Sequence, residues 1–237
     1  MPIDSGALNR KIAMSESEID GAKNRFLDRY NPDRSIDVAV ARAIGAAVQH
    51  NPLYRPNLAH RARDEWLEIR RVWSAYLQLI AARIIAARQK KDLDPFLWEY
   101  PNAGSLLHLE YSIVEDTQDS SPREEITEDY ARLIYGLRSA MNSYFATCFR
   151  ETGFRISHSQ KSVSVFLKHL WCMGRAPMPI QCPVDRNILR MLPDGANFGP
   201  WTRIDHISTH LEIITKLDRL AQPTPVAVWE LLIFQPI

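Results

Sequence analysis

Glycine is scarce in this sequence, which has 9 glycines among 237 residues, and no long stretch alternates apolar and polar residues. Both absences disfavour a sheet, and above all a parallel sheet whose phosphate-binding turns need glycine. The sequence also offers no phosphate-loop glycine signature and no convincing Ser-His-Asp order. Nucleoside triphosphatases and the common hydrolases are therefore disfavoured, and we expect an all-α fold.

Cysteine is rare as well, since only Cys148, Cys172 and Cys182 are present. Their odd number and wide spacing give no Cys-x-x-Cys pair for zinc and no four thiolates for an iron–sulfur cluster. His169 lies close to Cys172 in the sequence, but together with Cys182 it matches no standard metal site. We therefore expect reduced thiols, mostly in the core, and neither a metal nor another cofactor.

Long apolar runs are also absent. A membrane-spanning helix needs about 20 consecutive apolar residues, and no run approaches that length. The first residues, MPIDSGALNRKIAMSESEID, are too polar and acidic for a secretory signal. We therefore expect a cytoplasmic protein without a membrane partner, in which the 46% of hydrophobic residues are enough to build a core.

The charges are unevenly distributed, although the formal net charge is only +1. Basic residues dominate residues 55–91, acidic residues dominate 92–129, and basic residues dominate again from 150 to 190. Two basic segments that flank an acidic one would give a surface suited to nucleic acid if they met in the fold. Ordinary solvated helix faces explain the same pattern equally well.

What the sequence does contain is a series of amphipathic helical segments. The strongest covers residues 62–89, where the apolar residues fall at helical spacing, and we expect it to be a central packing helix. Its tryptophans Trp66 and Trp73 are expected in the core rather than stacked on bases. The other expected helices are residues 18–30, 35–50, 128–152, 160–174, 186–192, 197–223 and 224–234, with a break at 92–105 and an acidic loop at 114–129.

Several residues indicate where these helices begin and end. Ser35 and Thr224 are expected as N-caps, Pro225 is expected in a first turn, and Gly153 is expected as a helix stop. The closing segment WELLIF is expected to be buried. We expect one monomeric helical domain over residues 1–237, either undivided or built of two packed lobes, about 1–125 and about 126–237, with a cleft between them.

The stretch SHSQKSVSVFLKHLWCMGRAPMPIQCPVDRNILRML, residues 157–192, is the least generic part of the chain. Lys161 lies in the expected first turn of an amphipathic helix, off the apolar stripe, where unpaired N–H groups repel positive charge and favour a free amine. Asp185 follows a loop with three prolines and begins the next helix. A role as N-cap alone explains Asp185, and the same position keeps its carboxylate oriented and ionised.

This arrangement resembles the helix-hairpin-helix DNA glycosylase superfamily. In that family a helix-hairpin-helix is followed by a loop that ends in Pro-Val-Asp at the start of the next helix. Bifunctional members carry a lysine at the start of the second helix of the hairpin. Lys161 matches that lysine and Asp185, within CPVDRNIL, matches the aspartate. The resemblance covers about residues 145–192, with FRISHSQ at the turn of the hairpin.

The resemblance implies a DNA N-glycosylase with AP-lyase activity on duplex DNA that contains a damaged or modified base. Its target nucleotide would be flipped out of the duplex. Lys161 would attack the sugar C1′ as the base leaves, and Asp185 would stabilise the positive charge that develops on the sugar. A Schiff base and strand cleavage by β-elimination would follow.

The resemblance also implies DNA contacts at the turn of the hairpin, from Ser157, His158, Ser159 and Gln160. For His158, an exposed turn histidine without a ligand is the alternative.

Two other functions remain open. In the first, the protein is a non-catalytic helical module that binds nucleic acid or a partner protein, Lys161 contacts a phosphate, and Asp185 only caps a helix. In the second, the protein is an enzyme that acts on a free nucleoside or another small molecule and does not bind duplex DNA. The absence of a phosphate-cradling loop disfavours the second of these.

Overall fold

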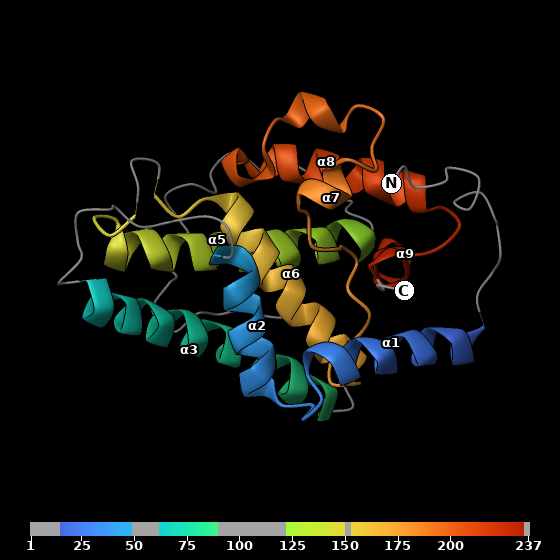
Figure 1. The fold of residues 1–237 in the computed structure, drawn as a ribbon, viewed down its shortest axis with the longest axis horizontal. Helices are drawn as coiled ribbons and strands as arrows, with labels where there is room; N and C mark the ends of the chain where they lie inside the picture. Colours follow the sequence, from blue (N-terminus) through green and yellow to red (C-terminus); the bar gives the residue numbers. More distant parts are fainter. Residues whose placement is uncertain (1–14, 49–61, 90–121, 150–152, 235–237) are drawn as a thin grey trace.

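A computed structural model describes residues 15–48, 62–89, 122–149 and 153–234, and every structural statement below refers to these residues. They form helices and connecting loops without a β-strand, so the expectation of an all-α fold is confirmed (Figure 1). The elements are α1 (Glu16–Tyr30), α2 (Ile36–Val48), α3 (Ala62–Gln89), α5 (Pro122–Phe145), α6 (Ile156–Cys172), α7 (Arg186–Leu189), the 3-10 helices η2 (Gly195–Phe198) and η3 (Trp201–Arg203), α8 (Ile207–Ala221) and α9 (Val226–Ile233).

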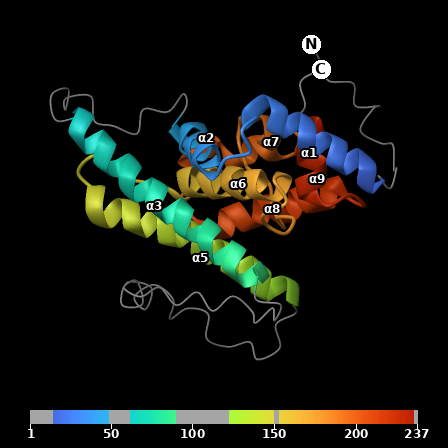
Figure 2. The same ribbon diagram turned by 90° about the horizontal axis from the view of Figure 1, so that it is seen from below.

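Helix α6 lies at the centre of the fold, with α3 and α5 side by side on one flank and α1 and α9 on the other (Figures 1 and 2). It contacts α1, α2, α3, α5, α8 and η3. Every residue of α6 except Val165 and Leu167 is buried, including all of its polar residues. Because buried polar groups need partners, the polar residues of α6 determine which loops and helices can pack around it.

Three apolar clusters surround α6. The largest joins α2, α3, α5 and α6 around Trp73, Leu137 and Phe166. A second is formed by residues 182–229, from the loop before α7 to α9, and a third joins α1, the end of α6 and α9. The largest cluster takes residues from both sides of position 125. Residues from both sides of position 125 therefore share one apolar cluster.

The first three helices lie where the sequence predicts them, although α1 begins at Glu16, two residues before the predicted start, and α2 is described over Ile36–Val48. Asn31 is the C-cap of α1, and Ser15 forms a capping box with Glu18 at the other end. The Ser35 hydroxyl accepts a hydrogen bond from the Asp37 N–H at the start of α2. Helix α3 covers the predicted residues 62–89, and Trp73 is fully buried, as expected.

The bounds predicted for α5 were wrong at both ends. The helix begins at Pro122, inside the expected acidic loop, and it ends at Phe145 rather than at Gly153. Proline is well tolerated at the first position of a helix. At the other end, the Asn142 side chain accepts from the Phe154 N–H at 2.7 Å and donates to the Phe154 carbonyl at 2.9 Å. Gly153 has a φ of 65° and allows this close approach of Asn142.

Helix α6 begins earlier than predicted, because residues 156–160 are helical rather than part of a turn. Lys161 therefore lies in the second turn of α6 and not in the first. The Ile156 N–H is bound by a carboxylate from another part of the chain, Asp205, whose oxygen is 3.1 Å away. A partner that is distant in the sequence thus sets this helix start, which explains why local sequence signals did not reveal it.

The C-terminal segment also departs from prediction. The expected single helix of residues 197–223 is replaced by η2, η3 and α8, since Gly199 with a φ of 66° and Pro200 interrupt it. At α9 the N-cap is Pro225 rather than Thr224. The segment WELLIF is buried only in its first half, because Ile233 and Phe234 are exposed.

Two further predictions concern membrane-spanning helices and the state of the cysteines. Among the helices described here, none combines the length with the apolar composition that crossing a membrane requires. The three cysteines are free thiols and all are buried, as predicted. The expected break at 92–105 and the acidic stretch 114–121 lie outside the described residues.

Candidate active site

Lys161 and Asp185 meet in the structure. The Lys161 Nζ lies 2.8 Å from the Asp185 Oδ2, where it donates a hydrogen bond within an ion pair. Solvent reaches 10% of the Lys161 side chain and 16% of the Asp185 side chain. The pair is therefore desolvated on most sides, and a small part of each side chain reaches the surface.

Asp185 uses its two carboxylate oxygens for two different tasks. Oδ1 accepts hydrogen bonds from the N–H groups of Asn187 at 2.9 Å and Ile188 at 3.0 Å, which makes Asp185 the N-cap of α7. Oδ2 faces Lys161. The predicted capping role and a contact with Lys161 are thus both present, and neither excludes the other.

The surroundings of Asp185 keep its carboxylate ionised. Burial by itself raises the pKa, but the charge and hydrogen bond of Lys161 and the N–H groups of Ile188 and Asn187 outweigh it. The net effect is a pKa of Asp185 below its ordinary value of 3.8. At neutral pH the group is a fixed negative charge aimed at the Lys161 amine.

The residues next to this pair are joined as well. The Gln160 Nε2 donates to the Val184 carbonyl at 2.7 Å, and the Gln160 Oε1 accepts from the Val184 N–H at 3.2 Å. Gln160 and Val184 are almost completely buried. Gln160 is thus bound to Val184, and the next residue of α6, Lys161, is bound to the next residue of the loop, Asp185.

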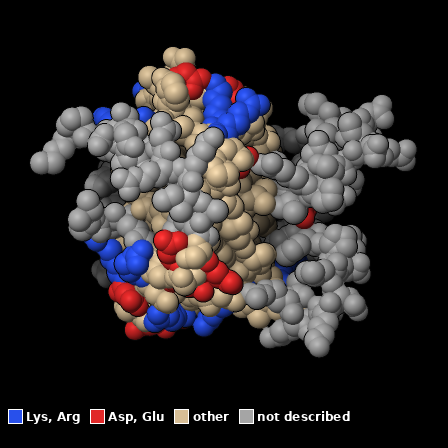
Figure 3. All heavy atoms as spheres, turned by 90° about the vertical axis from the view of Figure 1, so that its right-hand side faces the viewer, with Lys and Arg blue, Asp and Glu red and all other residues tan. Residues whose placement is uncertain are grey.

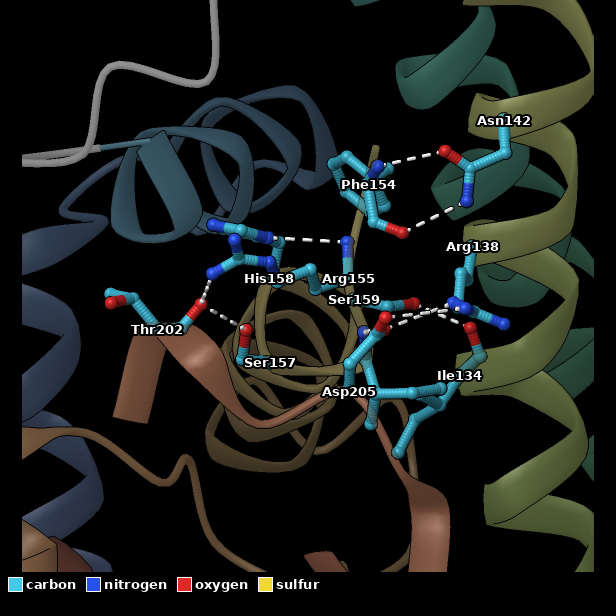
Figure 4. Close-up of polar contacts among 11 residues, drawn as sticks. Ile134, Arg138, Asn142, Phe154, Arg155, Ser157, His158, Ser159, Thr202 and Asp205 are labelled. Atoms are coloured by element: carbon cyan, nitrogen blue, oxygen red, sulfur yellow. Dashed lines mark hydrogen bonds and ion pairs between the residues drawn. The ribbon is translucent and has the colours of Figure 1, made fainter. Parts of the chain in front are cut away.

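The four residues predicted to contact DNA lie inside the protein. Ser157, His158, Ser159 and Gln160 are each at most 2% exposed. The Ser157 hydroxyl donates to the Thr202 carbonyl and the Ser159 hydroxyl donates to the Ile134 carbonyl (Figure 4). As they lie in this structure, none of the four presents a surface to DNA.

His158 is not the exposed turn histidine that was considered as an alternative, because it lies within α6 and is buried. Its Nδ1 accepts a hydrogen bond from the Arg155 N–H at 3.3 Å. Burial, and to a smaller extent the charge of Arg155, lower the pKa of His158 to about 3. The imidazole is neutral at physiological pH and closes the first turn of α6.

The N-terminus of α6 is covered by the segment that contains η3. Asp205 binds the Ile156 N–H and forms an ion pair with Arg138 of α5 at 3.2 Å (Figure 4). The Ile204 carbonyl accepts from the Ser157 N–H at 2.9 Å. Arg155 donates to the Thr202 carbonyl at 2.7 Å. The helix start, where the resemblance predicts a DNA phosphate, is occupied by groups of the protein itself.

A second lysine of α6 forms an ion pair that the sequence did not reveal. The Lys168 Nζ lies 2.6 Å from the Glu230 Oε2 of α9, and both side chains are almost fully buried. The ring centroids of Phe26 and Phe234 lie 4.7 Å and 5.2 Å from the Lys168 Nζ. Lys168 follows Lys161 by seven residues, so the spacing placed it near the same face of α6 but gave no sign of its partner.

An apolar pocket of about 240 Å³ lies apart from the ion pair. Its lining includes Tyr130 and Leu133 of α5, Leu167 of α6 and the loop residues 176–180, but neither Lys161 nor Asp185. In the part of the chain described here, no group of three or more His, Cys, Asp or Glu side chains is arranged to hold a metal ion.

The charged side chains do not separate by sign on the face drawn in Figure 3. Basic and acidic groups lie close to one another there. Several of the exposed arginines are paired, as Arg71 is with Glu68 and Arg132 with Asp129. Among the described residues drawn on this face, basic and acidic side chains are thus interspersed.

No protein-family model, curated protein or solved structure matches this chain. The case for a function therefore depends on the geometry around Lys161 and Asp185.

Proposed function

We propose that this protein is a DNA N-glycosylase with AP-lyase activity, in which Lys161 is the nucleophile and Asp185 stabilises the charge on the sugar. The observation that carries this proposal is the 2.8 Å contact between the Lys161 amine and the Asp185 carboxylate at the start of α7. These residues come from two elements separated by a loop with three prolines, and the resemblance to the helix-hairpin-helix glycosylases is based on the same two residues.

The proposed reaction begins when DNA opens the ion pair. The C1′ atom of the flipped-out nucleotide takes a place beside the Lys161 Nζ, and the bond from C1′ to the base breaks with its electron pair leaving on the base. The base accepts the proton that Lys161 gives up, so that the free amine bonds to C1′. Asp185, which keeps its negative charge, stabilises the positive charge that develops on the sugar.

The lyase step uses the same covalent bond. Opening of the sugar ring leaves an iminium between the Lys161 nitrogen and C1′, with the ring oxygen released as a hydroxyl. Loss of a proton from C2′ then expels the 3′ phosphate by β-elimination and cleaves the strand. The excised base is a damaged or modified base in duplex DNA.

The test is borohydride trapping on a duplex that contains one abasic site, because borohydride reduces the iminium to a stable amine. Wild-type protein is expected to give a covalent adduct, and Lys161→Gln is expected to give none. Lys216→Gln is the matched control, since Lys216 also pairs with a carboxylate, that of Asp194, but lies on α8. An adduct that persists in Lys161→Gln would overturn the role of Lys161.

A second candidate function is a non-catalytic helical module that binds nucleic acid or protein. It is favoured by the Lys168–Glu230 pair, which shows that α6 also uses a lysine and a carboxylate purely to join helices. Under this function the Lys161–Asp185 pair has the same structural purpose. Two results together would favour this second function. The wild-type protein would give no adduct, and Lys161→Gln would still bind the duplex.

A further inference from the structure

The amide of Gln160 attaches the loop before α7 to the central helix. Its nitrogen donates to the Val184 carbonyl and its oxygen accepts from the Val184 N–H, at 2.7 Å and 3.2 Å. One amide that bonds both groups of one residue fixes the position of that backbone and also its rotation, whereas a single hydrogen bond would leave the loop free to pivot. Both partners are buried, so water cannot replace either bond.

The rest of this loop is held at few points. Near its start, the N–H groups of Arg175 and Ala176 donate to the Leu170 carbonyl. Further along, the Gln181 side chain meets His210 at 3.2 Å. For residues 177–180 the described part of the chain shows no hydrogen bond. The amide of Gln160 is thus the attachment that immediately precedes Asp185.

We propose that Gln160 is a positioning residue, whose amide holds Val184 so that the Asp185 carboxylate meets both Lys161 and the first N–H groups of α7. Gln160 precedes Lys161 and Val184 precedes Asp185, and consecutive Cα atoms are only about 3.8 Å apart. A displacement of Val184 therefore moves Asp185 away from the lysine. The consequence for catalysis rests on the proposed function, but the positioning of Asp185 does not.

Gln160→Met tests this inference, because methionine has nearly the same length and no amide. We expect the rate of borohydride trapping to fall roughly 10- to 100-fold, as a misplaced reacting group does when it moves by about 1 Å. The matched control is Ser162→Ala, which removes another buried hydrogen bond of α6, the one from the Trp73 Nε1 at 2.9 Å. The control is expected to trap at the wild-type rate.

Gln160→Glu provides a second variant with an internal control. A protonated carboxyl group has the same donor and acceptor as the amide, but a carboxylate cannot donate to the Val184 carbonyl. At about pH 5 the trapping rate of Gln160→Glu is therefore expected to equal that of the wild type. As the pH rises to about 9, its trapping rate is expected to fall relative to that of the wild type. This comparison remains informative if Gln160→Met does not fold.

The carboxyl carbon of Asp185, followed by NMR, gives a readout that does not require DNA. In the wild type its pKa lies below the ordinary value, and in Gln160→Met it is expected to move back up as Lys161 and the α7 N–H groups withdraw. The inference would be overturned if Gln160→Met kept both the wild-type pKa of Asp185 and the wild-type trapping rate. No adduct from the wild type, with the NMR shift still seen in Gln160→Met, would reject only the proposed function.

Discussion

Asp185 combines two tasks in one carboxylate, because one oxygen caps α7 and the other faces Lys161. The two tasks can be separated by substitution. Asparagine is about as good an N-cap as aspartate, but it has no charge to offer Lys161. Alanine performs neither task.

Asp185→Ala is therefore expected to lower the free energy of unfolding by about 1 kcal/mol more than Asp185→Asn, which is the usual value of an N-cap. Urea unfolding followed by circular dichroism measures the difference. Equal losses in the two variants would show that the cap contributes nothing to stability.

The low pKa of Asp185 also predicts how stability depends on pH. The folded pKa lies below the unfolded value of about 3.9, so the stabilisation is complete at a pH above that value and is lost as the pH falls through the folded pKa. The gap in unfolding free energy between the wild type and Asp185→Asn should stay constant above about pH 5 and shrink below about pH 4. A constant gap down to the lowest pH at which the protein folds would contradict this.

At the scale of elements, α6 is a central helix with many buried polar residues, and each of the two lysines it carries needs a carboxylate from a different element. Removing one partner of a buried ion pair leaves an uncompensated charge, which costs far more than the pair contributes. The Lys168–Glu230 pair joins α6 to α9 and is the more buried of the two.

Glu230→Gln is thus expected to destabilise the protein by about 3–5 kcal/mol, since Lys168 is left buried without a negative partner. The double variant Lys168→Met, Glu230→Leu should recover most of that loss, because two apolar side chains replace both charges. Urea unfolding of the wild type, Lys168→Met, Glu230→Leu and the double variant forms a complete cycle. A double variant as unstable as Glu230→Gln would mean that packing, not charge, determines the loss.

The sequence predicted the helices better than their ends. Apolar spacing depends on the face that a helix buries, and it correctly indicated α3 and the stripe of α6. The start of α6 depends on Asp205 and the end of α5 on contacts of Asn142 with Phe154, and neither is visible in a local pattern. Helix ends were missed where the groups that complete them come from elsewhere in the chain.

For the candidate site, the sequence indicated the two residues but not the contact between them. Asp185 was identified because it begins a helix. Lys161 was identified because it was expected in the first turn of α6, although it lies in the second. Their convergence depends on the path of the loop, and so on the bonds between Gln160 and Val184. A glutamine beside a lysine carries no sequence signal of that role, and polar residues near an expected turn suggested DNA contacts instead.

At the scale of the whole molecule, the arginines that follow Asp185 differ from most others. Arg186, Arg190 and Arg203 are exposed, and within the described part of the chain their guanidinium groups form no hydrogen bond or ion pair. Arg186 and Arg190 lie one turn apart at α7, directly beside the candidate site. Under the proposed function they are available to the phosphates that flank the target nucleotide.

The double variant Arg186→Gln, Arg190→Gln is expected to weaken duplex binding and to make the slope of log K against log salt about 2 units less steep, roughly 0.9 for each lost phosphate contact. Fluorescence anisotropy at several salt concentrations measures the slope. Arg71→Gln is the control, because Arg71 is exposed but paired with Glu68 on α3. An unchanged slope in the double variant would remove α7 from the DNA contact.

The central place of α6 also has a consequence for how the protein is made. Lys168 and its partner Glu230 are 62 residues apart, and α8 and α9, which cover α6, follow it in the sequence. While the ribosome is still synthesising residues 207–233, α6 has already been made. The polar groups that α6 buries in the finished fold do not yet have all of their partners. The native contacts of α6 can therefore be completed only after α9 has left the exit tunnel, and until then the nascent chain exposes polar groups of α6 that the finished fold buries.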